Sequence, residues 1–182
     1  MEKGNAQSVV SSGVGRSVGS EEQLFATGVY TATCYDADGN EKWSDTYTNL
    51  VVTAGKNDLL DKYLTGSAYT AAWYLGLVDG ASAPTYAAGD TSASHSGWTE
   101  SVAYSNATRP APSWGSAAAG AKATTATAFN INATATIAGT FLISNSTKSG
   151  TTGILYSAGS FSGGNKSVAS GDTLNVTYTA SV

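Results

Sequence analysis

Two C-terminal segments alternate strictly between apolar and polar residues, and this pattern constrains the fold more than any other feature. The apolar positions are Phe129, Ile131, Ala133, Ala135 and Ile137 in the first segment, and Leu174, Val176, Tyr178 and Ala180 in the second. A period of two places successive side chains on opposite faces of a β-strand. Each segment therefore predicts a strand of an antiparallel sheet, with one face in a core and the other toward water or another subunit.

Residues 29–52 predict a β-hairpin. Two β-rich runs are joined by Asp38-Gly39, a pair that is typical of a two-residue type I′ turn because both residues tolerate a positive φ. The apolar run at 70–80 predicts a buried central strand, and the runs at 139–144 and 153–161 predict two further strands. Segments rich in Gly, Ser and Asn separate them, as expected of turns.

One short helix is expected near 57–65. Asn57 can cap its start and Gly66 can end it. So short a helix is not stable alone and must pack across the end of a sheet. Its apolar face is predicted to consist of Leu59, Leu60, Tyr63 and Leu64.

Many short strands, regular turn signals and a single helix indicate an all-β protein with an antiparallel β-sandwich. We prefer a jelly-roll to an immunoglobulin-like order, because a long excursion at 79–120 interrupts the strands. The predicted domains are a flexible Gly/Ser-rich N-terminal arm at 1–23 and a single β-sandwich domain at 24–182. The arm either orders against a partner or is a leader without a role.

Charged residues make up only 12% of the 182 residues, and the net charge is −4. Without a cluster of Lys and Arg, nucleic acid is not an expected partner. A surface so poor in charge is weakly protected against association, so we expect neighbouring subunits to cover it. No apolar run is long enough for a membrane helix or the core of a signal peptide, so we expect a soluble protein with no membrane partner, made in a cytoplasm.

The stretch "DTSASHSGWTE" holds His95, the only histidine, between Asp90 and Glu100. A catalytic triad needs a nucleophile beside the histidine, and the serines here lie in no G-x-S-x-G motif. A metal site needs several ligands at a regular spacing, which is also missing. Cys34 is the only cysteine, which excludes a Cys-based zinc site. We therefore expect an architectural loop, with no catalytic residue, no metal and no cofactor.

Aromatic residues are frequent, with four Trp and ten Tyr. Exposed rings on a β-sandwich can stack on sugars, whereas buried rings fill a core or hold a loop in place. Arg109 can bind Glu100 within the chain or a carboxylate across an interface. The candidate interface residues of the long excursion are Trp98, Tyr104, Arg109 and Trp114.

The order of several segments in 48–182 resembles that of small structural proteins of tailed bacteriophages, of the capsid decoration or cement type. The most specific segments are "WYLGLVDG", "GWTE" followed by Tyr104 and Arg109-Pro110, and the terminal "GDTLNVTYT". The resemblance implies a β-sandwich that assembles as a homo-oligomer, often a homotrimer, on the outside of the major capsid protein lattice. It implies no catalytic residues.

From the resemblance we expect a non-enzymatic virion structural protein at the capsid surface, which binds the major capsid protein and stabilises the head. The alternative is a tail-associated or receptor-binding β-sandwich that binds carbohydrate through its aromatic residues. A low-charge surface of small residues suits either assembly, because few charges are desolvated when it is buried.

Overall fold

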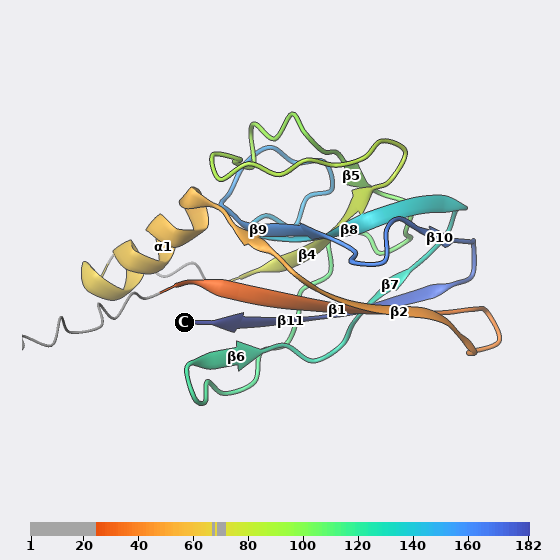
Figure 1. Ribbon diagram of the computed structural model, residues 1–182, viewed down its shortest axis with the longest axis horizontal. Helices are drawn as coiled ribbons and strands as arrows, with labels where there is room; N and C mark the ends of the chain where they lie inside the picture. Colours follow the sequence, from red (N-terminus) through yellow and green to blue (C-terminus); the bar gives the residue numbers. More distant parts are fainter. Residues whose placement is uncertain (1–24, 67, 69–71) are drawn as a thin grey trace, which may run out of the picture.

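Two antiparallel sheets face each other in the computed structural model, which describes residues 25–66, 68 and 72–182 (Figure 1). This arrangement confirms the all-β sandwich, while the jelly-roll order stays a prediction. The first sheet contains β1 (Thr27–Tyr35), β2 (Glu41–Thr48), β6 (Ala121–Ala123), β7 (Thr127–Asn130) and β11 (Thr173–Ser181). The second contains β3 (Leu50–Val51), β4 (Tyr74–Asp79), β5 (Glu100–Ser101), β8 (Ala135–Ile143), β9 (Leu155–Ser160) and β10 (Lys166–Val168).

The first sheet has the order β2-β1-β11-β6, and β7 also pairs with β11. β1 and β11 pair along their whole length, from Thr27 opposite Ser181 to Tyr35 opposite Thr173. The apolar positions of β11 point into the core, where Leu174, Val176 and Tyr178 are fully buried. The alternation predicted for this strand is confirmed.

The other alternating segment, 129–137, is not one strand. β7 ends at Asn130 in the first sheet and β8 begins at Ala135 in the second. Between them, Ile131 is held by backbone hydrogen bonds with Gly171 and Asp172, and Ala133 is exposed. The prediction of a single strand is wrong because the chain crosses between the sheets here while the alternation of residue types continues.

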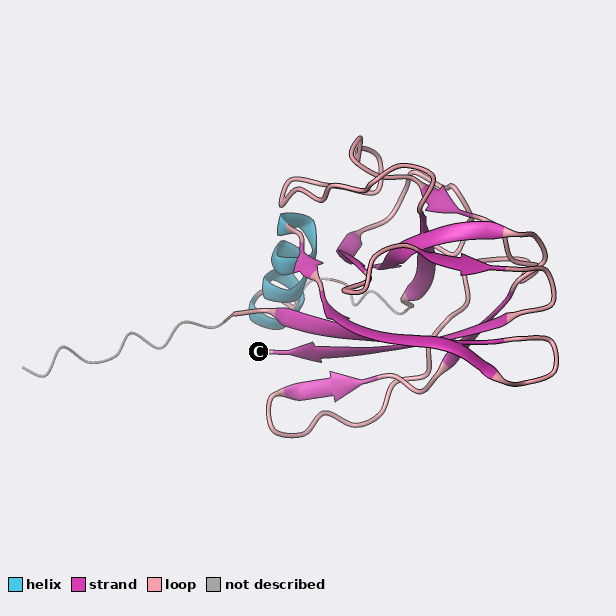
Figure 2. Ribbon diagram, turned by 45° about the vertical axis from the view of Figure 1, so that its right-hand side comes forward, coloured by secondary structure: helices cyan, strands magenta, loops and turns pink. Residues whose placement is uncertain are grey.

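The second sheet has the order β3-β9-β8-β4-β5, with β10 beside β8. The predicted central strand is confirmed as β4, which lies between β8 and β5. Leu75 and Leu77 pack in the core between the sheets, whereas Val78 and Phe141 belong to a second apolar cluster. The excursion after β4 covers this outer cluster and contains one short strand, β5 (Figures 1 and 2).

The only α-helix in the described residues, α1 (Thr53–Leu64), begins four residues earlier than predicted. Val52 precedes its first turn without a side-chain cap, so Asn57 is an interior residue and not the N-cap. Gly55 determines the docking, because a Cβ there would lie 2.5 Å from the carbonyl oxygen of Tyr156. Gly66 follows the helix with a φ of 63°, as predicted for the glycine that ends it.

Most of the predicted apolar face of α1 does not pack on the sheets. Leu60, Tyr63 and Leu64 are 47%, 84% and 69% exposed, and Gly55 is the buried residue of the helix. We call Leu60, Tyr63 and Leu64 the α1 ridge. The prediction of their burial is wrong because the helix docks through its first turn, which leaves the later apolar side chains in solvent.

The predicted β1–β2 hairpin is present, but its turn is not type I′. A hydrogen bond from the Gly39 N–H to the Asp36 carbonyl closes a turn over residues 36–39, and only Gly39 has a positive φ, of 85°. The Asp36 carboxylate accepts hydrogen bonds from the backbone N–H groups of Asp38 and Asn40. This capping stabilises a longer loop than the sequence pair Asp38-Gly39 suggests.

The predicted N-terminal arm, residues 1–23, lies outside the described residues. Within the part of the chain that the structure describes, no helix has the length and apolar character needed to cross a membrane.

Candidate functional site

Trp98 covers the outer face of the second sheet of its own chain. It is 5% exposed, and its ring lies 5.1 Å from that of Phe141. Its indole N–H donates to the carboxylate of Asp90 over 3.0 Å, and the ring of His95 stacks on it at 4.0 Å. His95 is thus held by contacts that fix the loop, since its Nδ1 also lies 3.0 Å from the Trp98 carbonyl oxygen.

Arg109 binds Glu100 within the chain. Its Nε and Nη2 donate to the two carboxylate oxygens over 2.9 and 2.8 Å, and both side chains are about 95% buried (3% and 5% exposed). Nη1 donates to the carbonyl oxygen of Asn145, and the Ser149 N–H donates to Glu100. The pair therefore joins β5 and the excursion to the turn between β8 and β9.

Tyr104 is also an internal residue. It packs edge-to-face on Phe129 at 5.0 Å, and the Lys148 ammonium lies 4.0 Å from the centre of its ring. Burial raises the pKa of the Tyr104 hydroxyl, and the nearby Glu100 carboxylate raises it further. Three of the four candidate interface residues, Trp98, Tyr104 and Arg109, are thus buried within their own chain. Any effect that they have on an interface is therefore indirect.

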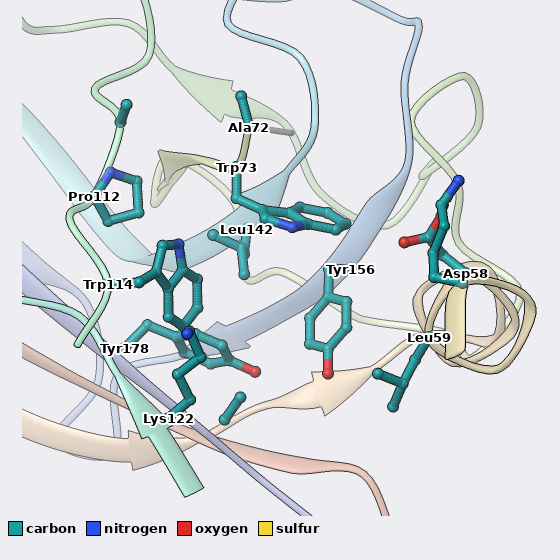
Figure 3. A pocket seen from close by; sticks show the side chains of 13 residues that line it. Asp58, Leu59, Ala72, Trp73, Pro112, Trp114, Lys122, Leu142, Tyr156 and Tyr178 are labelled. Carbon is teal, nitrogen blue, oxygen red and sulfur yellow. Dashed lines mark ion pairs between the residues drawn. The ribbon is translucent and has the colours of Figure 1, made fainter. Parts of the chain in front are cut away.

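The fourth candidate, Trp114, is half-buried and forms one wall of a groove of about 440 Å³. The groove opens between the two sheets, beside α1. Figure 3 shows Trp114 and Pro112 on one side and Trp73, Tyr156 and Leu59 on the other. Its lining comprises Asp58, Leu59, Lys62, Ala72, Trp73, Ala111, Pro112, Trp114, Lys122, Leu142, Tyr156, Tyr178 and Ala180. We call it the aromatic groove.

Four rings form a continuous series along the aromatic groove. Trp73 contacts Tyr156 at 5.5 Å, Tyr156 contacts Tyr178 at 6.4 Å, and Tyr178 contacts Trp114 at 6.2 Å, all edge-to-face. Burial raises the pKa of the Tyr156 hydroxyl, and so does the carboxylate of Asp58. Edge-to-face packing holds each ring against the next, so the lining is fixed before any ligand arrives.

A β-bulge explains why Tyr156 reaches the aromatic groove. The register of β8 and β9 shifts here: Leu142 faces Ser157, but Ile143 faces Leu155. The extra residue, Tyr156, uses its carbonyl oxygen to accept a hydrogen bond from Val52. A bulge re-aims a side chain. Sequence reasoning missed this residue because the shift breaks the alternation that would have revealed it.

The outer face of the first sheet is the second surface of interest. Its outward side chains are uncharged along β1, β11 and the last five residues of β2. Thr31 lies opposite Thr46 on one neighbour and Thr177 on the other, and the Thr31 and Thr46 hydroxyls are 3.0 Å apart. We call this surface the threonine face; it comprises Thr27, Val29, Thr31, Thr33, Tyr35, Ser44, Thr46, Thr48, Thr173, Asn175, Thr177, Thr179 and Ser181.

No cluster of three or more His, Cys, Asp or Glu side chains that could hold a metal ion occurs among the described residues. The described chain is thus a β-sandwich with one sheet covered by an internal loop and an aromatic groove between the sheets. The other sheet has an outer face that is uncharged over β1, β11 and the last five residues of β2. Comparison of the sequence with protein-family models and with curated proteins gives no match.

Proposed function

We propose that this protein is a non-enzymatic structural protein of a tailed-phage virion that decorates the head by binding the major capsid protein lattice. The observation that carries the proposal is the threonine face, a broad outer sheet surface without a charged side chain. A surface of this kind suits a permanent protein contact better than it suits free exposure to water.

The energetics of burial favour such a contact. A charge that is moved into an interface without a partner carries a desolvation cost of several kcal/mol. Two hydroxyl pairs of the threonine face are already hydrogen-bonded within the sheet, Thr31 with Thr46 and Thr33 with Ser44, each at 3.0 Å. These four hydroxyls can be buried without a new partner, while the methyl groups of threonine contribute apolar area.

The proposal includes a homo-oligomer, for which we expect three copies. The α1 ridge supports association, because three neighbouring apolar side chains in solvent are more than the scattered exposure of a monomer requires. Many weak contacts along a repeating lattice combine into tight attachment even where each contact is modest.

The proposal is tested by mixing purified protein with phage heads that lack it and sedimenting the heads. Wild-type protein should co-sediment to saturation. Thr31→Lys and Thr177→Lys each place a charge at the centre of the threonine face and should weaken binding at least about tenfold. The control is Thr151→Lys, in an exposed loop of the other sheet, which should bind as the wild type does. Equal binding by all variants would exclude this face.

A further inference from the structure

We infer that the aromatic groove is a binding site for a saccharide, which is a function beyond attachment to a capsid. Three hydrogen-bonding groups of its lining support this inference. Among the described residues, nothing bonds to the indole N–H of Trp73, the indole N–H of Trp114 or the hydroxyl of Tyr156. By contrast, Trp43 and Trp98 both donate their indole N–H within the chain.

The groups around the aromatic groove match the two kinds of surface that a sugar ring presents. A pyranose has apolar C–H faces, which stack on aromatic rings, and a rim of hydroxyl groups, which donate and accept hydrogen bonds. Trp73, Trp114 and Tyr156 supply ring surface together with donors. Asp58 supplies a carboxylate on the α1 side, of which Oδ1 lies 3.6 Å from the Lys62 ammonium and Oδ2 can accept from a ligand. Lys122 lies at the edge of the groove on β6 (Figure 3).

Lys122 forms no ion pair or hydrogen bond with any residue that the structure describes. No described side chain therefore competes with a ligand for its ammonium group. The volume of about 440 Å³ lies within the range of small-molecule sites and admits one or two sugar rings. These properties favour a short oligosaccharide or the end of a longer glycan.

An extended peptide fits the aromatic groove less well, because the strands in its lining have their backbone groups paired. β6 is the edge strand of its sheet, but Ala121 and Ala123 form backbone hydrogen bonds with Ala118 and Gly115 on its outer side. Ala180 of β11 pairs with Gly28 on one side and Lys122 on the other. Leu142 of β8 pairs with both Leu75 and Ser157. A peptide that binds by strand addition needs unpaired backbone groups, which this lining does not offer.

The test measures binding of short oligomers of glucose, galactose, mannose and N-acetylglucosamine to the full chain, by saturation-transfer NMR and tryptophan fluorescence. At least one oligomer should bind saturably. Trp114→Ala should weaken that binding about tenfold or more, because it removes a stacking surface and a donor. The control is Trp43→Ala, a half-buried tryptophan outside the groove, which should bind like the wild type.

Tyr156→Phe and Lys122→Ala keep the inference testable if Trp114→Ala fails to fold. Each removes one polar group at the groove and should weaken binding several-fold while the melting temperature stays unchanged. The inference is overturned if none of these oligomers binds, or if binding is equal in all groove variants. It is also overturned if an extended peptide or a second copy of the chain occupies the groove in place of a sugar. Capsid attachment is unaffected by either result, because it rests on the threonine face.

Discussion

Arg109 and Glu100 form a bidentate ion pair that is buried inside the chain, with hydrogen bonds of 2.9 and 2.8 Å. The guanidinium also lies 5.3 Å from the centre of the Phe141 ring, on the outer face of the second sheet. One arginine thus holds together a short strand, a long loop and a turn. The excursion behaves as a third layer of the sandwich because this pair and Trp98 anchor it.

Glu100→Gln should lower the free energy of unfolding by about 3 to 5 kcal/mol, because it leaves the charge of Arg109 buried without its partner. Urea denaturation at neutral pH measures the change. Glu41→Gln alters an exposed residue of β2 and is the matched control, with an expected change within about 0.5 kcal/mol. A loss below about 1 kcal/mol for Glu100→Gln would mean that the pair does not anchor the loop.

Stability should fall in acid, partly through Asp45. Burial raises the pKa of this carboxyl, but hydrogen bonds from Ser162 and Gly163 and the charge of Lys166 outweigh it and hold the pKa below its usual value. A lowered folded-state pKa stabilises the fold above the unfolded value of about 3.9, and this contribution disappears as the pH falls through the folded value.

Asp45→Asn should therefore reduce the free energy of unfolding at pH 7 and flatten its decline in acid. Urea denaturation of both proteins from neutral pH down to about pH 2 to 3 gives the comparison. If the two curves remain parallel over the whole range, Asp45 does not contribute to the acid sensitivity.

Gly55→Ala should displace α1 from β9, because the new Cβ would lie 2.5 Å from the carbonyl oxygen of Tyr156. We expect a loss of about 1 to 3 kcal/mol despite the higher helix propensity of alanine. Gly115→Ala is the control, since its nearest neighbour would be 3.5 Å away, an ordinary contact. A Gly55→Ala protein as stable as the wild type would show that the close approach of helix and strand is not required.

The free protein should sediment with three times the mass of one chain. Analytical ultracentrifugation over a range of concentrations measures this directly. A monomer at all concentrations would contradict the homotrimer, although it would leave attachment to a lattice as a separate question.

The parts of the fold that were predictable from sequence are those in which local pattern and burial agree. In β11 the residue types alternate, and the apolar positions are the buried ones. A regular strand places alternate side chains on the same face, so only one set can point into the core. The segment 129–137 alternates equally well but divides between two sheets, since a crossing depends on distant partners such as Asp172. A residue pattern contains no information about such contacts.

The sites were less predictable for the same reason. The sequence offered Arg109 two partners, Glu100 within the chain or a carboxylate across an interface, and the fold shows that Glu100 is the partner. Tyr156 lines the aromatic groove because of a bulge, and Asp58 and Leu59 reach it because α1 docks through Gly55. Trp98 was a candidate interface residue, but it packs on Phe141 of its own chain and holds the loop that contains it in place.

The most direct test of the proposed function is an electron cryomicroscopy reconstruction of the phage particle that contains this protein. We predict density for the β-sandwich at regularly repeated positions on the outside of the head, with the threonine face against the major capsid protein. Density confined to the neck or the tail, or a head surface without this sandwich, would contradict the account.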